Sequence, residues 1–231
     1  MKTFIALAAA TAVASLAAIA AAQPSELVST QPIKTAPKDA VEVTLGAGYT
    51  QGFGKIAGPT SVPDVARAGV AVDLGLAYRL DPRLSLGVAG QYNEFDRGDV
   101  SGTRGARGML AGIDGTYHIM PYTGLDPWVR LGTAYRFLWQ DRNEPTANVL
   151  THGWSIARLS VGLDVRTSPS LALAPHIGAD MNMFFFRRMD GGTNDTIADT
   201  RLNTFVYAGI LGRFDIGGTR VHESGLTVAK R

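Results

Sequence analysis

The sequence predicts an all-β protein: an eight-stranded antiparallel up-and-down β-barrel that crosses a membrane with its strands. Three observations predict this fold class. Apolar residues alternate with small or polar ones, this alternation recurs about eight times between residues 41 and 217, and the connections between the segments alternate between long and short.

The alternation is clearest between residues 68 and 80. One parity there is apolar throughout, whereas the other carries glycine, alanine, Asp73 and Arg79. Because successive side chains of a strand point to opposite faces, this segment has one apolar face and one small, polar face. In a transmembrane barrel the apolar face meets lipid and the polar face lines the interior.

The same alternation predicts eight strands along the chain. They are residues 41–51, 68–80, 84–95, 106–119, 128–140, 154–166, 171–186 and 203–216. In the seventh strand, Pro175 has no amide hydrogen to donate, so a bulge or a local break is expected there. In the eighth strand, Leu211 falls in the otherwise polar parity, which leaves the phase of that strand open.

The connections run in the order long, tight, long, short, long, tight, long. Outer-membrane barrels have short periplasmic turns, longer external loops and both termini in the periplasm. This order fits eight strands if the first strand runs from the periplasm toward the cell surface. It predicts extracellular loops at residues 52–65, 96–104, 141–149 and 187–200, through which an external ligand would bind.

Aromatic residues are expected at both strand ends, because amphipathic rings favour the membrane boundaries. The predicted outer ends carry Tyr49, Tyr92, Phe95, Trp139, Trp154, Phe184, Phe185 and Phe186. The predicted inner ends carry Tyr78, Tyr117, Tyr122, Trp128 and Phe214.

The N-terminus predicts export. Lys2 precedes an apolar, alanine-rich stretch over residues 4–20, and three alanines at 20–22 form a small-residue cleavage site, so residues 1–22 are expected to be a signal peptide. Residues 23–40, with three prolines, are expected to be a flexible periplasmic segment. The barrel is expected over 41–217 and a C-terminal tail over 218–231.

Composition narrows the class further. The formal net charge is only +2 and the charges are dispersed, so there is no basic stripe and nucleic-acid binding is not expected. The sequence has no cysteine, so lipid attachment and thiol chemistry are not expected. The 27 glycines suit a crowded barrel interior.

The chain resembles the small eight-stranded outer-membrane barrels of the OmpA-transmembrane-domain, OmpX and OmpW type. The resemblance covers about residues 41–217 and rests on the signal peptide, the strand-and-loop rhythm and segments such as DPRLSLGV at 81–88. It departs after the barrel, where no peptidoglycan-binding domain is expected and a tail over residues 218–231 follows the aromatic-ended last strand. The resemblance implies a monomer in the outer membrane of a Gram-negative bacterium, in contact with outer-membrane lipids and lipopolysaccharide.

Charged and histidine side chains of the polar parity are predicted to line the lumen. They are Asp73, Arg79, Asp114, His118, Arg130, Arg136, Arg158, Asp164, His176, Asp180 and Arg213. An eight-stranded barrel is just wide enough for its own side chains, and an isolated buried charge is costly. A self-neutralising network that plugs the lumen is therefore expected. The alternatives are a narrow water or ion path gated by the same pairs, and a binding cavity.

By resemblance, the expected role is envelope structure or surface interaction through the loops. A narrow pore for small solutes and OmpW-like transport of small apolar molecules are the alternatives. A soluble periplasmic barrel of the lipocalin kind would turn the apolar parity inward. Glycine, alanine and serine dominate the polar parity at mid-strand, which favours a cramped lumen over a solvated face.

No enzyme, cofactor or metal site is expected. His152 and Ser155 lie near an outer strand end, with Asp141 and Glu144 in the adjoining loop. Residues three apart on a strand face opposite ways, so these two would not form a hydrolytic pair. Likewise His118 and His176, even with Asp114 and Asp180, match no spacing of metal ligands, and are interpreted as interior hydrogen-bonding groups.

Overall fold

The computed structural model describes residues 35–143 and 147–220. The predicted signal peptide, residues 23–34 of the lead-in segment, Glu144 and the tail after residue 220 lie outside this part. Within it, no helix is long and apolar enough to cross a membrane.

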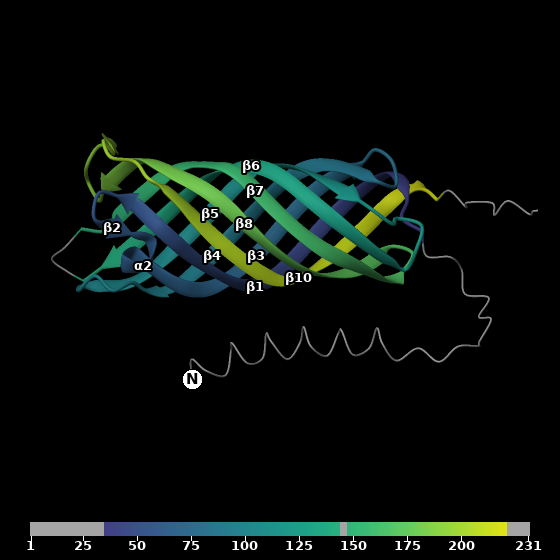
Figure 1. Cartoon of the computed structure of the whole chain (residues 1–231), viewed down its shortest axis with the longest axis horizontal. Coiled ribbons are helices and arrows are strands. Elements are labelled where there is room, and N and C mark those ends of the chain that lie inside the picture. Colours follow the sequence, from purple (N-terminus) through teal and green to yellow (C-terminus); the bar gives the residue numbers. More distant parts are fainter. Residues whose placement is uncertain (1–34, 144–146, 221–231) are drawn as a thin grey trace, which may run out of the picture. The chain divides into compact units, whose positions relative to one another are not determined.

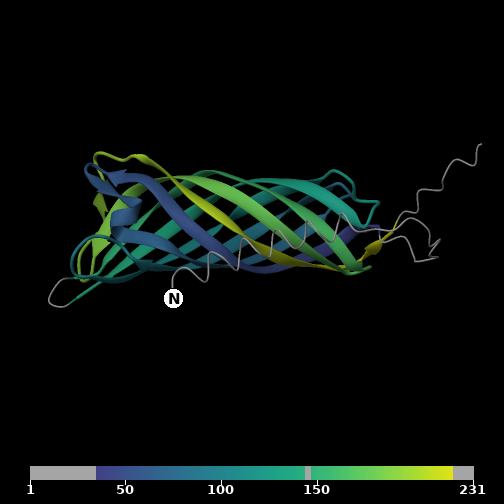
Figure 2. The same cartoon turned by 60° about the horizontal axis from the view of Figure 1, so that its bottom comes forward.

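Eight long strands form a closed antiparallel ring (Figure 1). They are β1 (Lys38–Ala57), β3 (Ala66–Arg79), β4 (Leu84–Arg97), β5 (Thr103–His118), β6 (Leu125–Arg142), β7 (Val149–Ser168), β8 (Leu171–Met189) and β10 (Leu202–Thr219). Each pairs with the next of these strands, and β10 pairs with β1, which closes the sheet without an edge. The predicted eight-stranded up-and-down barrel is confirmed, and Figure 2 shows the same ring from another side.

Every long strand exceeds its predicted length, mostly at the end of the barrel that carries the long connections, here called the loop end. β1 reaches residue 57 and β7 begins at residue 149, because strand pairing continues after the apolar alternation has stopped. Beyond lipid, neither face of a strand has to be apolar, so the sequence pattern fades before the hydrogen bonds do. The other end, with connections at 80–83, 119–124 and 169–170, is called the turn end.

The predicted loop at 52–65 therefore contains regular structure. After β1 come the short strand β2 (Thr60–Ser61), which pairs with β1, and the one-turn helix α2 (Val62–Val65). The amide of Ser61 donates a 2.6 Å hydrogen bond to the Asp64 carboxylate, and Pro63 favours the first turn. In the last loop, β9 (Asp195–Thr196) pairs with β8.

The two faces of the sheet point as the alternation predicts. Leu74 is 58 % exposed and Ile113 is 61 % exposed on the outside, whereas Arg79 and Arg213 are fully buried inside. The alternative of a soluble barrel with an apolar interior is thereby contradicted. Leu211 is buried inside, so the phase of β10 follows its polar parity.

Two irregularities differ from the expectation. A register shift between Ser155 and Ala157 changes the parity of β7 that faces inward, so Ser155 and Arg158 are both buried although they are three residues apart. Pro175 causes no bulge, because β8 keeps one register with β10 through this residue and with β7 on either side of it. Only the ladder with β7 is interrupted there, so a local break is present and a bulge is not.

We expect Leu74→Arg to destabilise the folded barrel by about 2–4 kcal/mol, because Leu74 faces the lipid near mid-strand. Leu80→Arg, at the exposed end of the same apolar row, should cost only about 0–1 kcal/mol. Urea unfolding of the two variants in lipid vesicles checks the difference. Equal costs at the two positions would contradict the assigned depth of the apolar belt.

Candidate functional site: the barrel interior

Apolar side chains pack inside the loop end of the barrel. The buried cluster comprises Ile56, Val62, Val65, Ala66, Phe95, Ala106, Leu138, Phe184 and Phe205. Helix α2 contributes Val62 and Val65, so this short helix lies over the loop end with its apolar side inward. The rings of Phe95 and Phe205 lie 5.8 Å apart.

The predicted aromatic belts are wrong for three residues. Phe95 and Phe184 were expected at the outer membrane boundary and Trp128 at the inner one, but all three are buried inside. Phe95 shares its parity with inward-facing Asn93, and a register shift in β8 separates inward Phe184 from outward Phe186. Parity within the strand would have placed Phe95 correctly, whereas the register shift at Phe184 leaves no clear trace in the sequence.

A buried carboxylate lies directly below the apolar cluster. Asp180 accepts a 2.7 Å hydrogen bond from Arg136 and a 3.0 Å hydrogen bond from Arg158. Arg136 also donates to Asn182 at 3.0 Å, and its guanidinium lies 4.1 Å from the ring centre of Phe205. These contacts join the charged interior to the apolar cluster above it.

Three of the predicted lumen residues, Asp73, Asp114 and Arg130, lie nearer the middle of the barrel. Arg130 donates to Thr116 at 3.0 Å and lies 3.9 Å from a carboxylate oxygen of Asp114. Beside Arg130 is a cavity of about 10 Å³, which is room for about one water molecule. Asp73 accepts a 2.8 Å hydrogen bond from Gln91.

His176 packs between aromatic rings rather than beside the other predicted histidine. It stacks on Trp128 at 6.4 Å, with Tyr207 at 5.8 Å on another side. His176 is interior as predicted, but its buried Nε2 has no hydrogen-bond partner among the described residues, so the predicted hydrogen-bonding role is not seen at that atom.

The largest ion-pair cluster lies toward the turn end. Arg79 and Arg213 both bind the buried carboxylate of Glu42, with an Arg79–Glu42 distance of 2.6 Å. Arg213 also pairs with Asp164 at 3.0 Å. Asp215 accepts a 2.7 Å hydrogen bond from Arg166 and lies 3.8 Å from Arg79. These residues form one connected network across four strands, β1, β3, β7 and β10.

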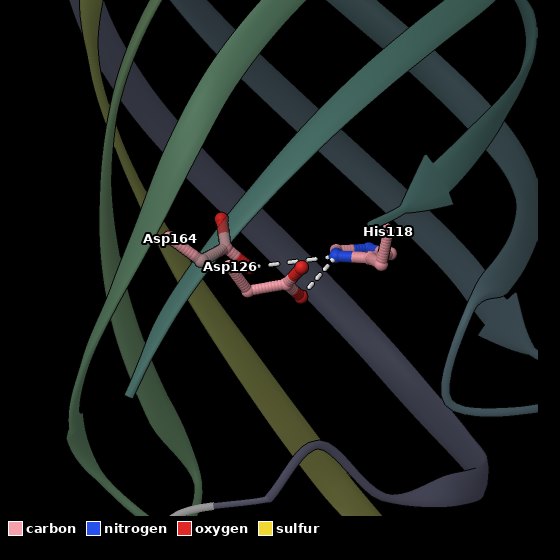
Figure 3. Close-up of side chains that lie close together, drawn as sticks. All are labelled: His118, Asp126 and Asp164. Atoms are coloured by element: carbon pink, nitrogen blue, oxygen red, sulfur yellow. Dashed lines mark hydrogen bonds and ion pairs between the residues drawn. The ribbon is translucent and has the colours of Figure 1, made fainter. Parts of the chain in front are cut away.

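His118 and two aspartates complete this network (Figure 3). Nδ1 of His118 lies 2.7 Å from Asp126 Oδ2 and 3.9 Å from Asp164 Oδ2. The other oxygen of Asp126 accepts a 2.9 Å hydrogen bond from the amide of Met120. Asp126 is thus held by β5 and its following turn as well as by its own strand.

The ligand atoms of His118, Asp126 and Asp164 are close enough together to hold a metal ion. However, Arg213 already binds Asp164, and the 2.7 Å contact of Asp126 with Nδ1 needs a proton between the two atoms. The surrounding guanidiniums would also repel a cation. A hydrogen-bonded ion network accounts for these residues better than a metal site does.

All of the predicted lumen residues point inward, and most of them are buried. The two buried groups around Asp180 and Glu42 also contain residues that the prediction did not include. They are Glu42, Asp126, Arg166, Asn182 and Asp215. Glu42, Arg166, Asn182 and Asp215 share the polar parity of their strands, so the pattern contained them. Asp126 was assigned to a turn, because strand β6 begins three residues earlier than predicted.

The pair considered for hydrolysis does not meet. Ser155 is buried inside the barrel, whereas His152 lies on the outer face and contacts the Tyr135 hydroxyl at 2.7 Å. Asp141 forms an ion pair with Arg107 at 3.0 Å. Ser155 and Asp141 thus have other surroundings than His152, and Glu144 lies outside the described residues.

The chain's own N-terminal segment contacts the turn end. Thr35 and Ala36 are buried, and the amide of Ala36 donates a 2.7 Å hydrogen bond to the carbonyl of Pro121. Thr35 and Ala36, expected to belong to a flexible lead-in, are thus packed against the barrel, and the last residues of that predicted segment, 38–40, belong to β1. Nearby, Arg83 donates a hydrogen bond to the Tyr117 hydroxyl, and this contact raises the pKa of Arg83.

No protein-family model matches this sequence, and no curated protein matches it. Solved structures do match its fold. The chain is similar to the outer membrane protein OprG from Pseudomonas aeruginosa, with a TM-score of 0.53 and 10 % sequence identity over 79 % of this chain and 99 % of that one. It is also similar to Neisserial surface protein A, with a TM-score of 0.51 and 11 % identity over 75 % of this chain and 96 % of that one.

The fold is therefore that of the small outer-membrane β-barrels. The resemblance to the OmpA, OmpX and OmpW type is confirmed at the level of architecture. The predicted location in the outer membrane of a Gram-negative bacterium agrees with these neighbours and with the apolar exterior.

We expect Asp180→Asn to destabilise the barrel by about 3–5 kcal/mol, because it leaves Arg136 and Arg158 buried without their carboxylate. The control is Asp199→Asn, which breaks an exposed pair with Arg201 and should cost no more than about 1 kcal/mol. Urea unfolding in vesicles measures both. A small, equal change in the two variants would contradict the role of Asp180 in neutralising the interior.

Proposed function

We propose that this protein is a closed outer-membrane barrel, without enzymatic activity, that serves the cell envelope as a structural element and presents its loops at the cell surface. One observation carries the proposal: inward side chains pack together or pair at three levels of the interior. The apolar cluster lies at the loop end, Asp180 and its arginines come next, and the Glu42 network lies toward the turn end.

The filled interior argues against a permanent pore. An ion entering the barrel would lose water and meet buried guanidiniums and carboxylates that already neutralise one another. The cavity beside Arg130 has room for about one water molecule, which is too little for a continuous file of water. A passage for small apolar molecules is also disfavoured, because the interior below the apolar cluster is charged.

The loop end supports a role at the surface. Strands β1, β7 and β8 have 19 or 20 residues each, whereas about 9–11 suffice to cross a membrane. With the first strand running outward, these strands carry the loops beyond the lipid headgroups. Outer-leaflet lipids and lipopolysaccharide are the neighbours that we propose for this region.

Planar-bilayer recording tests the closed state. We expect the folded wild-type barrel to give no regular single-channel steps, whereas a porin inserted in the same way does. Heat-modifiable migration on gels first establishes that the sample is folded. Regular steps from such a sample would contradict the proposed closure and favour the narrow pore.

A further inference from the structure

Six aromatic rings form one continuous patch on the outer face at the loop end. This aromatic patch consists of Tyr135, Phe137, Trp139, His152, Trp154 and Phe186, from β6, β7 and β8. Neighbouring ring centres lie between 5.1 Å and 5.9 Å apart. The other ring–ring contacts in the described part of the chain lie inside the barrel. Among the described residues, contacting aromatic rings on the outer face therefore occur only on the side formed by β6, β7 and β8.

Strand register arranges the patch in rows across four strands. At its centre, Met109, Phe137, His152 and Phe186 are successive cross-strand partners. One row nearer the loops, the partners are Arg107, Trp139, Leu150 and Arg188. An arginine therefore stands at each side of the patch, on the side away from mid-membrane.

Polar groups of the patch remain available to a ligand. Tyr135 occupies Nδ1 of His152, and Nε2 has no hydrogen-bond partner among the described residues. Arg188 is exposed and forms no ion pair with any residue that the structure describes. Arg107, in contrast, is partly neutralised by Asp141.

We propose that the aromatic patch and Arg188 bind a phosphorylated glycolipid of the outer leaflet, the lipid A part of lipopolysaccharide. This proposal rests on the proposed location and on loops that face outward. The rings offer flat apolar surface to acyl chains and to sugar faces, and the Arg188 guanidinium fits a phosphate group. His152 Nε2 supplies a further polar contact at the boundary between the two.

Charge and depth both favour this occupant. A guanidinium just above an aromatic belt can bury its stem along the rings while its head reaches the headgroups. In an outward-facing strand end, those headgroups belong to the outer leaflet, whose glycolipid carries phosphate on sugar. A zwitterionic phospholipid offers the acyl chains without the net negative charge, so it serves as the comparison lipid.

The experiment uses the folded full barrel in phosphatidylcholine vesicles with increasing fractions of diphosphoryl lipid A. Tryptophan fluorescence measures binding, because Trp139 and Trp154 belong to the patch whereas Trp128 is buried in the interior. Native mass spectrometry of the same samples counts lipid A molecules retained per barrel.

Two variants remove the proposed contacts: Arg188→Gln, and Phe137→Leu combined with Phe186→Leu. The matched controls are Lys55→Gln and Phe53→Leu, which change an exposed cation and an exposed ring on β1, a strand that carries no residue of the patch and is separated from β8 by β10. Heat-modifiable migration must be unchanged in all of them.

We expect saturable binding of lipid A by the wild type and about tenfold weaker binding in the Arg188→Gln variant, with a similar loss in the double leucine variant. The β1 controls should bind as the wild type does. Equal losses in variants and controls would overturn the proposal in favour of non-specific attraction, as would wild-type binding no stronger than to phosphatidylcholine alone. Loss of a dimer in the patch variants alone, with lipid binding intact, would reassign the patch to a second copy of the chain. Each of these outcomes is independent of the conductance test, so the site can fail while the closed barrel stands.

Discussion

Hydrocarbon on the outside is the constraint on which the rest of this structure depends. A strand has two faces, and lipid accepts only an apolar one, so the charged side chains of each strand at the depth of the hydrocarbon must turn into the lumen. The lumen of eight strands is narrow, so these charges must also neutralise one another. The clustering of Glu42, Asp164 and Asp215 with three arginines follows from these two demands together.

The same narrowness governs where glycine occurs. A Cβ at Gly162 would overlap the Trp128 ring, and a Cβ at Gly178 would overlap Tyr207. Each of these two large inward rings therefore lies against a glycine on the next strand. Such matching lets the interior hold aromatic rings, guanidiniums and carboxylates at once, and it supports the proposed closure.

The sequence predicted the fold, the direction of both faces and the inward charges, because each depends on a period of two. It did not predict the apolar cluster under α2. Phe95 and Phe184 stand at strand ends, where the sequence pattern expects membrane-boundary rings, but above the lipid an apolar ring is more stable when it packs inward among other apolar side chains. The partners within the network also could not be predicted. Whether Asp180 meets Arg136 depends on register and strand tilt, and a single bulge such as that in β7 changes both.

The most direct test of the account is a measurement of which face of a strand touches lipid. Because the chain has no cysteine, single cysteines can be introduced at successive positions from 70 to 79 in β3 and spin-labelled. In vesicles, accessibility to oxygen, which concentrates in lipid, should be high at Val70, Val72, Leu74, Leu76 and Tyr78 and low between them. Maxima at Asp73 and its parity, or no alternation along the strand, would contradict an apolar exterior around a charged interior.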